Sequence, residues 1–222
     1  MIKAVIFDMF ETLVTHYRSS LYFGEDIARD LNLPEERFRE IWDCTEVDRS
    51  IGKLTFEQTI RQIMEQNGID SEEAFKNVTE KRLHAKRELF NHLDVEIVTT
   101  LKALKERKIR LGLISNCFSE EAVVIRESIL YPFFDAAFLS YEQGIMKPDQ
   151  EIYVRCMRRL DVEPAECLYV GDGGSRELET AAELGMKTLQ ATWYFKENHR
   201  THLGYLQQFQ QISHPLETLD DL

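Results

Sequence analysis

The chain has 222 residues, of which 43% are hydrophobic, and a formal net charge of −12. This length accommodates one large α/β domain, or a core with a smaller inserted domain. The negative charge argues against general binding to nucleic acid or to an anionic membrane, because like charges repel. We expect a cytoplasmic protein: the sequence shows no secretory signal pattern, no apolar run of about 18 residues, and no metal-ligand spacing among its cysteines.

Short and almost continuous apolar runs predict the strands of a parallel sheet, because strands that are buried on both faces lack polar alternation. These runs lie at 4–7, 111–114, 136–139 and 167–170, with a possible fifth at 186–189. The later runs are separated by helical patterns over 94–108, 149–160 and 175–186. Asp149 is expected to cap the second of these helices and Gly185 to end the third. The alternation predicts an α/β fold with a doubly wound, Rossmann-like parallel sheet.

The segment between the first two strands departs from this alternation. Residues 17–90 contain no convincing strand, and their pattern predicts helices near 19–31, 35–48, 55–67 and 71–89. Such a block is too long for a single crossover connection. We therefore expect an inserted all-helical cap, residues 17–90, on a core formed by residues 1–16 and 91–222.

Polar side chains follow the apolar runs at the points where the strands end. Asp8 follows the first run, Ser115 and Asn116 the second, Lys147 the third after a short loop, and Asp172 the fourth. Ligands of an open parallel sheet bind beyond the carboxyl ends of its strands, so we expect these side chains to meet. Two carboxylates, a hydroxyl and an ammonium suit a divalent cation together with phosphate-like oxygens. Each residue alone is more typical of a turn, but the ordered set is hard to explain in that way.

With these residues in view, the chain resembles the haloacid dehalogenase superfamily of hydrolases, in its helical-cap branch. The four motifs that carry the resemblance are FDMFETL (7–13), LISN (113–116), GIMKP (144–148) and VGDGGSRE (170–177). The resemblance covers the whole chain and includes the helical insert. It implies a Mg²⁺-dependent hydrolase, most often a phosphatase, acting on a small phosphorylated metabolite.

The resemblance also implies a role for each matching residue. Asp8 would be the nucleophile and would form an aspartyl intermediate. Ser115 would hydrogen-bond the transferring phosphoryl group, and Lys147 would pair with the nucleophile and the phosphoryl oxygens. Asp8 and Asp172 would bind Mg²⁺, with Glu177 as a further acidic residue near them. A metal and an ammonium would neutralise the charge of a carboxylate that attacks a phosphoryl group.

Phe10 departs from the pattern of the family's phosphatases, which usually have Asp at this position. That Asp protonates the leaving group and then activates water, while its backbone carbonyl helps to bind the metal. Phe10 can supply only the carbonyl, and general acid–base catalysis is typically worth about 10²–10⁴-fold in rate. Glu11 and His16 are the candidates to replace the lost group, although we expect Glu11 to be a solvated turn residue and His16 a linker residue.

Phe10 leaves two alternatives open. The dehalogenases of this superfamily carry an aromatic residue at this position, since a halide leaves without a proton. They use no metal, however, and their fourth motif begins with Ser rather than with the Gly171-Asp172 pair found here. The second alternative is a non-catalytic protein that binds a phosphorylated ligand.

The cap is expected to decide the substrate. Its loop 48–55 carries Arg49 and Lys53, which we predict, together with Asn116, to bind the substrate. The alternative is an ordinary helix–helix turn with solvated charges. His199 and His202 are expected to be surface residues. The sequence predicts neither the substrate nor the oligomeric state.

Overall fold

The computed structural model describes residues 1–195 and 204–222, and its centre is one parallel six-stranded sheet. The strands are β1 (Ala4–Phe7), β2 (Arg110–Ser115), β3 (Ala136–Leu139), β4 (Cys167–Gly171), β5 (Lys187–Ala191) and β6 (Gln210–Ile212). Their order is β3-β2-β1-β4-β5-β6. All five predicted strands and the Rossmann-like architecture are confirmed. The short edge strand β6 was not predicted, because two of its three residues are exposed glutamines.

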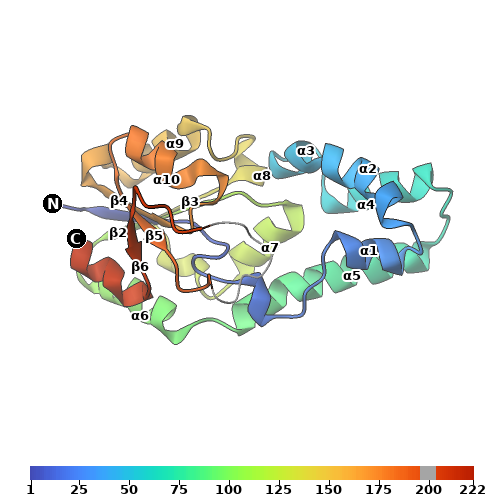
Figure 1. Cartoon of the computed structure of the whole chain (residues 1–222), viewed down its shortest axis with the longest axis horizontal. Coiled ribbons are helices and arrows are strands. Elements are labelled where there is room, and N and C mark those ends of the chain that lie inside the picture. Colours follow the sequence, from blue (N-terminus) through green and yellow to red (C-terminus); the bar gives the residue numbers. More distant parts are fainter. Residues whose placement is uncertain (196–203) are drawn as a thin grey trace.

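Helices cover both faces of the sheet (Figure 1). The helices of the core are α6 (Val95–Glu106), α7 (Ser119–Glu127), α8 (Ser140–Gln143), α9 (Gln150–Leu160) and α10 (Glu177–Glu183). Short 3-10 turns lie at His16–Arg18, Leu89–Asn91, Tyr131–Phe133, Pro164–Glu166, Gly174–Arg176 and Pro215–Asp221. As predicted, Asp149 caps α9 by accepting a hydrogen bond from the backbone N of Glu151 at 2.9 Å. Gly185, with a φ of 92°, follows the last turn of α10.

The burial of β1 explains its unbroken apolar run. Val5 and Phe7 pack in the apolar cluster that α6 and α7 share, whereas Ala4 and Ile6 pack against α9 and α10. Successive side chains of a strand point to opposite faces, so a strand covered on both faces needs apolar residues at every position. The polar residues are thereby confined to the strand ends.

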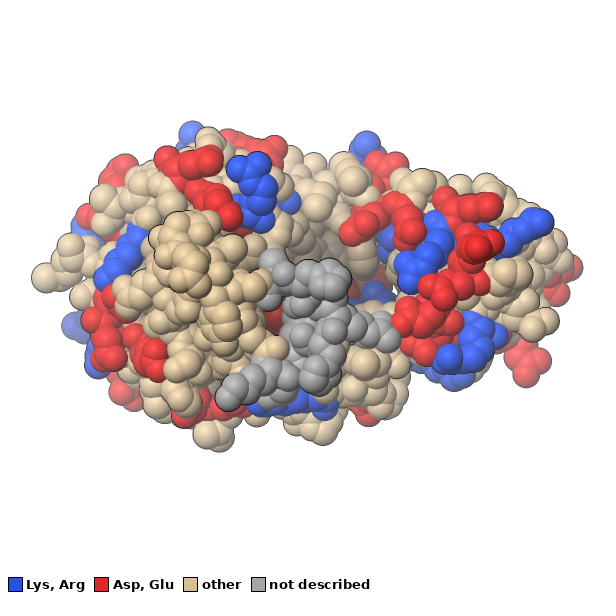
Figure 2. Space-filling model, viewed as in Figure 1, with Lys and Arg blue, Asp and Glu red and all other residues tan. Residues whose placement is uncertain are grey.

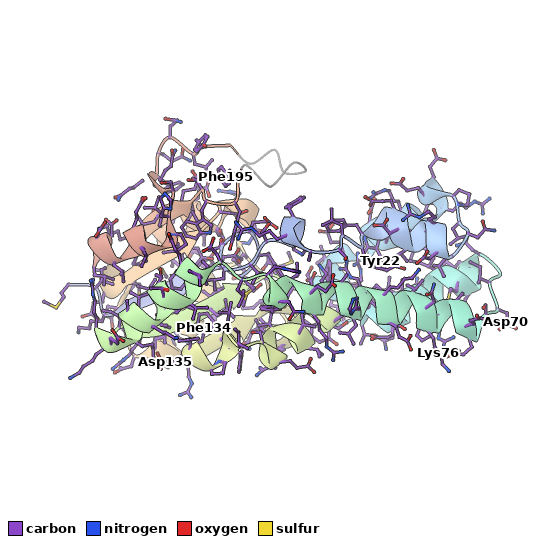
Figure 3. The ribbon with its side chains drawn as sticks, turned by 90° about the horizontal axis from the view of Figure 1, so that it is seen from below. Tyr22, Asp70, Lys76, Phe134, Asp135 and Phe195 are labelled. Atoms are coloured by element: carbon purple, nitrogen blue, oxygen red, sulfur yellow. The ribbon has the colours of Figure 1, made fainter. Side chains whose placement is uncertain are left out.

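The first five of the six α-helices between β1 and β2 form a second lobe, which we call the cap (Figure 1). They are α1 (Gly24–Asp30), α2 (Glu35–Cys44), α3 (Glu46–Ser50), α4 (Phe56–Gln66) and α5 (Glu72–Glu88). The cap has its own apolar cluster, which includes Ile27, Phe38 and Ile60. Seen from below, α5 runs from the far end of the cap, near Asp70, towards the core (Figure 3). The exact residues that divide cap from core stay a prediction.

A buried group of charged side chains joins α5 of the cap to α7 of the core, and we call it the α5–α7 ion cluster. Arg82 Nε lies 2.9 Å from Glu120 Oε1, and Lys86 Nζ lies 2.6 Å from Glu121 Oε1. All four side chains are at most 8% exposed. Because breaking a buried ion pair leaves an uncompensated charge, the cluster holds α5 against α7.

A second contact between cap and core lies at Gly52, in the turn after α3. A Cβ atom on Gly52 would lie 2.1 Å from the backbone oxygen of Tyr141 in α8, and Gly52 has a φ of +75°. Both the close approach and the left-handed conformation require glycine at this position. The cap therefore contacts the core on two sides.

The surface agrees with the acidic composition. On the face shown in Figure 2, Lys and Arg are interspersed with Asp and Glu and form no broad basic patch. Within the described residues, no helix combines the length and the apolar character needed to cross a membrane.

Candidate active site

A pocket of about 170 Å³ opens at the carboxyl ends of the central strands. Its lining consists of Asp8, Phe10, Glu11, Asn116, Lys147, Asp172, Gly174, Ser175 and Glu177. Strands β2, β1 and β4 are neighbours in the sheet, so the residues after them meet although they are far apart in the sequence. Of the residues predicted from the strand ends, the structure brings Asp8, Asn116, Lys147 and Asp172 together here.

Lys147 bridges two buried carboxylates. Its Nζ lies 2.5 Å from Asp8 Oδ1 and 2.5 Å from Glu177 Oε2. The hydroxyl of Tyr169 donates a second hydrogen bond to Glu177 Oε2, at 2.9 Å, and the backbone N of Gly173 donates to Glu177 Oε1 at 3.1 Å. Glu177 thus fixes the ammonium beside Asp8.

The backbone of Lys147 is held by the side chain of Asn116. Asn116 Nδ2 donates to the carbonyl oxygen of Lys147 at 3.0 Å, and Lys147 N donates to Asn116 Oδ1 at 2.8 Å. The same Nδ2 also donates to the hydroxyl oxygen of Ser175 at 3.3 Å. This pair of hydrogen bonds ties the loop that carries Lys147 to the end of β2.

The carboxylates of the pocket are crowded. Burial, and then the charge of Glu177, raise the pKa of Asp8 to about 7, although Lys147 opposes the shift. Burial and the neighbouring charge of Asp8 raise the pKa of Asp172 to about 6, and burial raises that of Glu177. Burial would lower the pKa of Lys147, but the charges of Asp8 and Glu177 raise it above its usual value. One ammonium therefore pairs with two carboxylates while a third, Asp172, lies beside them, and the site has an excess of negative charge.

This donor set fits a divalent cation. Asp8, Asp172 and Glu177 each offer a carboxylate oxygen within 4.8 Å of the other two. Glu177 is already engaged by Lys147 and two further donors, so Asp8 and Asp172 are the available pair. Carboxylate and carbonyl oxygens are the ligands that Mg²⁺ prefers, and a cation between Asp8 and Asp172 would offset the excess charge. The carbonyl of Phe10 as a third ligand stays a prediction.

The expectation that Glu11 is a solvated turn residue is wrong. Glu11 is 8% exposed, has a φ of 56°, and lines the pocket beside Phe10. Its Oε2 accepts from the Thr15 hydroxyl at 2.7 Å, and its Oε1 lies 3.0 Å from both the backbone N and Nδ1 of His16. The Nε2 of His16 in turn lies 2.9 Å from Nζ of Lys86. A chain of buried polar contacts therefore runs from the pocket to the α5–α7 ion cluster.

Sequence reasoning did not identify Lys86. A lysine within the charged sequence of α5 gives no signal of burial, because charged residues on helices are usually solvated. The pKa of His16 is lowered by burial and by the nearby ammonium of Lys86.

Three other predicted residues lie away from the pocket lining. Ser115 is fully buried at the end of β2, and its hydroxyl donates to the carbonyl oxygen of Asn116 at 3.3 Å. Arg49 is also buried, with its guanidinium 3.6 Å from the ring centroid of Trp42, and its Nη1 has no hydrogen-bond partner among the described residues. Lys53 is exposed and pairs with a neighbouring aspartate of the cap.

Lys53 is thus exposed, as a turn with solvated charges would have it, whereas Arg49 is buried. Binding of substrate by either residue stays a prediction. His199 and His202 lie outside the described residues.

The chain matches the haloacid dehalogenase-like hydrolase family over residues 2–185. It belongs to this family, and the protein is a hydrolase. Glyceraldehyde 3-phosphate phosphatase of Methanopyrus kandleri is 28% identical over 204 residues, which make up 86% of this chain and 84% of that relative. Phosphoglycolate phosphatase of Aquifex aeolicus is 32% identical over 105 residues, or 46% of this chain and 49% of the relative.

Solved structures of the family share the fold. A 2-haloacid dehalogenase from Pseudomonas syringae has a TM-score of 0.72 and 23% identity, with 99% of this chain and 97% of the other covered. An enzyme from Bacteroides thetaiotaomicron, in complex with magnesium and inorganic phosphate, has a TM-score of 0.62 and 20% identity, with 86% and 94% covered. At these identities the structures establish the common fold and no shared activity.

Proposed function

We propose that the protein is a Mg²⁺-dependent phosphatase that hydrolyses a small phosphorylated metabolite through an aspartyl-phosphate on Asp8. The observation that carries the proposal is the position of Asp8, which lies 2.5 Å from Lys147 on one side and beside Asp172 on the other. A nucleophilic carboxylate needs neighbouring positive charge when it approaches an anionic phosphoryl group.

The two oxygens of Asp8 have different surroundings. Oδ1 accepts a hydrogen bond from Lys147, whereas Oδ2 lies 3.5 Å from the hydroxyl of Thr12. In the proposed reaction one carboxylate oxygen of Asp8 attacks phosphorus, while Lys147 orients the carboxylate and neutralises phosphoryl oxygens. The hydroxyl of Ser115 would have to turn from the Asn116 carbonyl to reach the phosphoryl group.

Bound Mg²⁺ would neutralise charge between the phosphoryl oxygens and the carboxylates of Asp8 and Asp172. The names of the relatives support the proposal, since two of them are phosphatases of small phosphorylated compounds. The Mg²⁺ and phosphate present together in a structural neighbour support the choice of metal. Cap movement would admit the substrate and release the product.

Phe10 favours a second candidate, a 2-haloacid dehalogenase. Phe10 lines the pocket together with Asp8, as this alternative requires. However, the dehalogenases that the chain resembles use no metal, and the excess negative charge around Asp8 and Asp172 is explained most simply by a cation. We therefore place the phosphatase first.

The test of the nucleophile is Asp8→Asn, with Asp70→Asn as the matched control. Asp70 is exposed at the far end of the cap, so the same chemical change there should leave the activity unchanged (Figure 3). Asp8→Asn should abolish phosphate release and keep the wild-type circular dichroism spectrum. Wild-type turnover in the Asp8→Asn variant would refute the assignment.

The test of the reaction is a screen of phosphate esters and 2-haloacids, each with Mg²⁺ and with EDTA. The proposal predicts phosphate release that EDTA stops and that added Mg²⁺ restores. Halide release that is indifferent to EDTA would identify the dehalogenase instead.

A further inference from the structure

We infer that this site acts on phosphate compounds whose leaving group departs as a stable anion, acyl phosphates above all, rather than on alkyl phosphates. The inference rests on the proposed function and narrows its substrate class. It follows from the surroundings of Phe10, Glu11 and His16 and from the engagement of every other carboxylate in the pocket.

Phe10 brings a hydrocarbon to the pocket lining, at the position where the phosphatases that the chain resembles carry their general acid. Its ring packs against the ring of His16 at a tilt of 32°, with centroids 4.9 Å apart, and the ammonium of Lys86 lies 5.6 Å from the Phe10 ring centroid. The ring is thus packed between the pocket and the α5–α7 ion cluster. It can give no proton to a departing oxygen.

Glu11 and His16 do not replace the missing acid. Both carboxylate oxygens of Glu11 are turned to Thr15 and His16, which together supply three hydrogen bonds. Both ring nitrogens of His16 are engaged, Nδ1 by Glu11 and Nε2 by Lys86. These two side chains hold each other and the segment that leads from the core to the cap, so each of their polar side-chain atoms already has a partner.

The other acidic groups of the pocket lining also have assigned tasks. Asp8 is the nucleophile, Asp172 faces it with Oδ1 bound to the backbone N of Gly174 at 2.8 Å, and Glu177 holds Lys147. In the part of the lining that the structure describes, no carboxyl group remains to protonate a leaving group. Reactions that need a general acid should be slower by about 10²–10⁴-fold than in a site that has one.

An acyl phosphate avoids this limitation. In the first step a bond forms between an oxygen of Asp8 and phosphorus, the bond from phosphorus to the acyl oxygen breaks, and the carboxylate leaves with the electron pair. Carboxylic acids have a pKa of about 4, so this product needs no proton at neutral pH. An alkyl phosphate would have to expel an alkoxide, which does need a proton.

The second step, hydrolysis of the aspartyl-phosphate, likewise exchanges one bond to phosphorus for another. The oxygen of water bonds to phosphorus, the bond from phosphorus to Asp8 breaks, and the electron pair returns to the Asp8 carboxylate. The protons of the attacking water remain on the inorganic phosphate or pass to solvent. Since Asp8 is itself a carboxylate leaving group, this step needs no general acid. The activation of water that Phe10 cannot supply is lost equally for every substrate, because all of them form the same aspartyl-phosphate.

The experiment compares kcat/KM for acetyl phosphate, 4-nitrophenyl phosphate, phenyl phosphate and glycerol phosphate with Mg²⁺ present, plotted against the pKa of the leaving group. Spontaneous hydrolysis is subtracted with Asp8→Asn. For the wild type we expect kcat/KM to fall steeply as the pKa of the leaving group rises. Acetyl phosphate should be preferred over glycerol phosphate by about 10²–10⁴-fold. Phe10→Asp should raise the rate with glycerol phosphate and flatten the plot. Asn has the size of Asp and no acidic proton, so the plot for Phe10→Asn should stay as steep as that of the wild type.

The outcomes separate the two proposals. If the wild type hydrolyses glycerol phosphate as fast as acetyl phosphate, the substrate inference is wrong and the phosphatase proposal stands. If Phe10→Asp and Phe10→Asn have the same slope, the missing acid is not the cause and the inference fails. If no compound gives Mg²⁺-dependent phosphate release, the phosphatase proposal itself fails. The wild-type plot decides between the substrate classes even where a Phe10 variant does not fold.

Discussion

Replacing Glu121 by Gln tests how strongly the α5–α7 ion cluster holds the cap to the core. Glu121 Oε1 lies 2.6 Å from Lys86 Nζ and 3.5 Å from Arg82 Nη2, and its side chain is 8% exposed. Burial would raise the pKa of Glu121, but the charges of Lys86 and Arg82 lower it from 4.5 to about 2. At about 1.4 kcal/mol per pKa unit, this shift corresponds to roughly 3 kcal/mol of stability at neutral pH.

The pH dependence of this contribution has a definite sign. Because the pKa of Glu121 is lower in the folded protein than in the unfolded chain, the stabilisation is complete above a pH of about 4.5 and is lost as the pH falls towards 2. The difference in unfolding free energy between wild type and Glu121→Gln should therefore be constant between about pH 6 and about pH 7. It should shrink at pH values of about 4 and below.

The assay is urea unfolding followed by circular dichroism at several pH values. The matched control is Glu127→Gln, since Glu127 pairs with Arg87 between the same two helices at 3.1 Å, with both side chains 52% exposed. An exposed pair contributes about 0–1 kcal/mol, so the control should change little. Equal losses in the two variants, or a loss in Glu121→Gln that persists unchanged in acid, would refute the reasoning.

Two further predictions concern glycines whose missing side chains leave room for a contact. Gly52→Ala should lower the melting temperature much more than Gly68→Ala: both have positive φ, but an added Cβ meets the Tyr141 oxygen at 2.1 Å only at Gly52, while nothing lies within 4 Å at Gly68. Gly68→Ala then reports only the cost of holding a non-glycine residue in the left-handed conformation, about 1–2 kcal/mol. Equal melting temperatures for the two variants would show that the cap moves away from Tyr141 at little cost. Gly171→Ala should reduce kcat in a phosphatase assay while the fold persists, because its Cβ would lie 2.0 Å from Glu177 Oε1 and push that carboxylate away from Lys147. An unchanged kcat would show that Glu177 does not need its present position.

The sheet could be predicted because a strand that is buried on both faces has apolar residues at every position. Strand β1 reads Ala-Val-Ile-Phe and every residue is buried, so its type and its end at Asp8 follow from the letters alone. Strand β6 has no such apolar pattern, because it lies at the edge of the sheet and Gln210 and Gln211 are exposed. Its place depends on pairing with β5, which only the folded chain defines.

The site likewise contains residues whose positions the sequence predicts and residues whose positions it does not. The rule that parallel strands end at one edge predicts that Asp8, Lys147 and Asp172 meet, and they do. The burial of Lys86 could not be predicted, because its partner Glu121 comes from a distant segment. The burial of Glu11 could not be predicted either, because its contacts with Thr15 and His16 give no signal in the sequence. A charged residue gives the same sequence signal whether it is solvated or paired inside the protein.

The reciprocal hydrogen bonds between Asn116 and the backbone of Lys147 have a consequence for variation in this family. The amide side chain imitates a peptide unit, so it offers Lys147 the donor and acceptor that a neighbouring strand would offer. The height of the ammonium above the sheet is then set by β2 as well as by the chain through α8 and the short turn 144–146 that follows it. Insertions in that turn should therefore move the charge that faces the nucleophile less than they would without these hydrogen bonds.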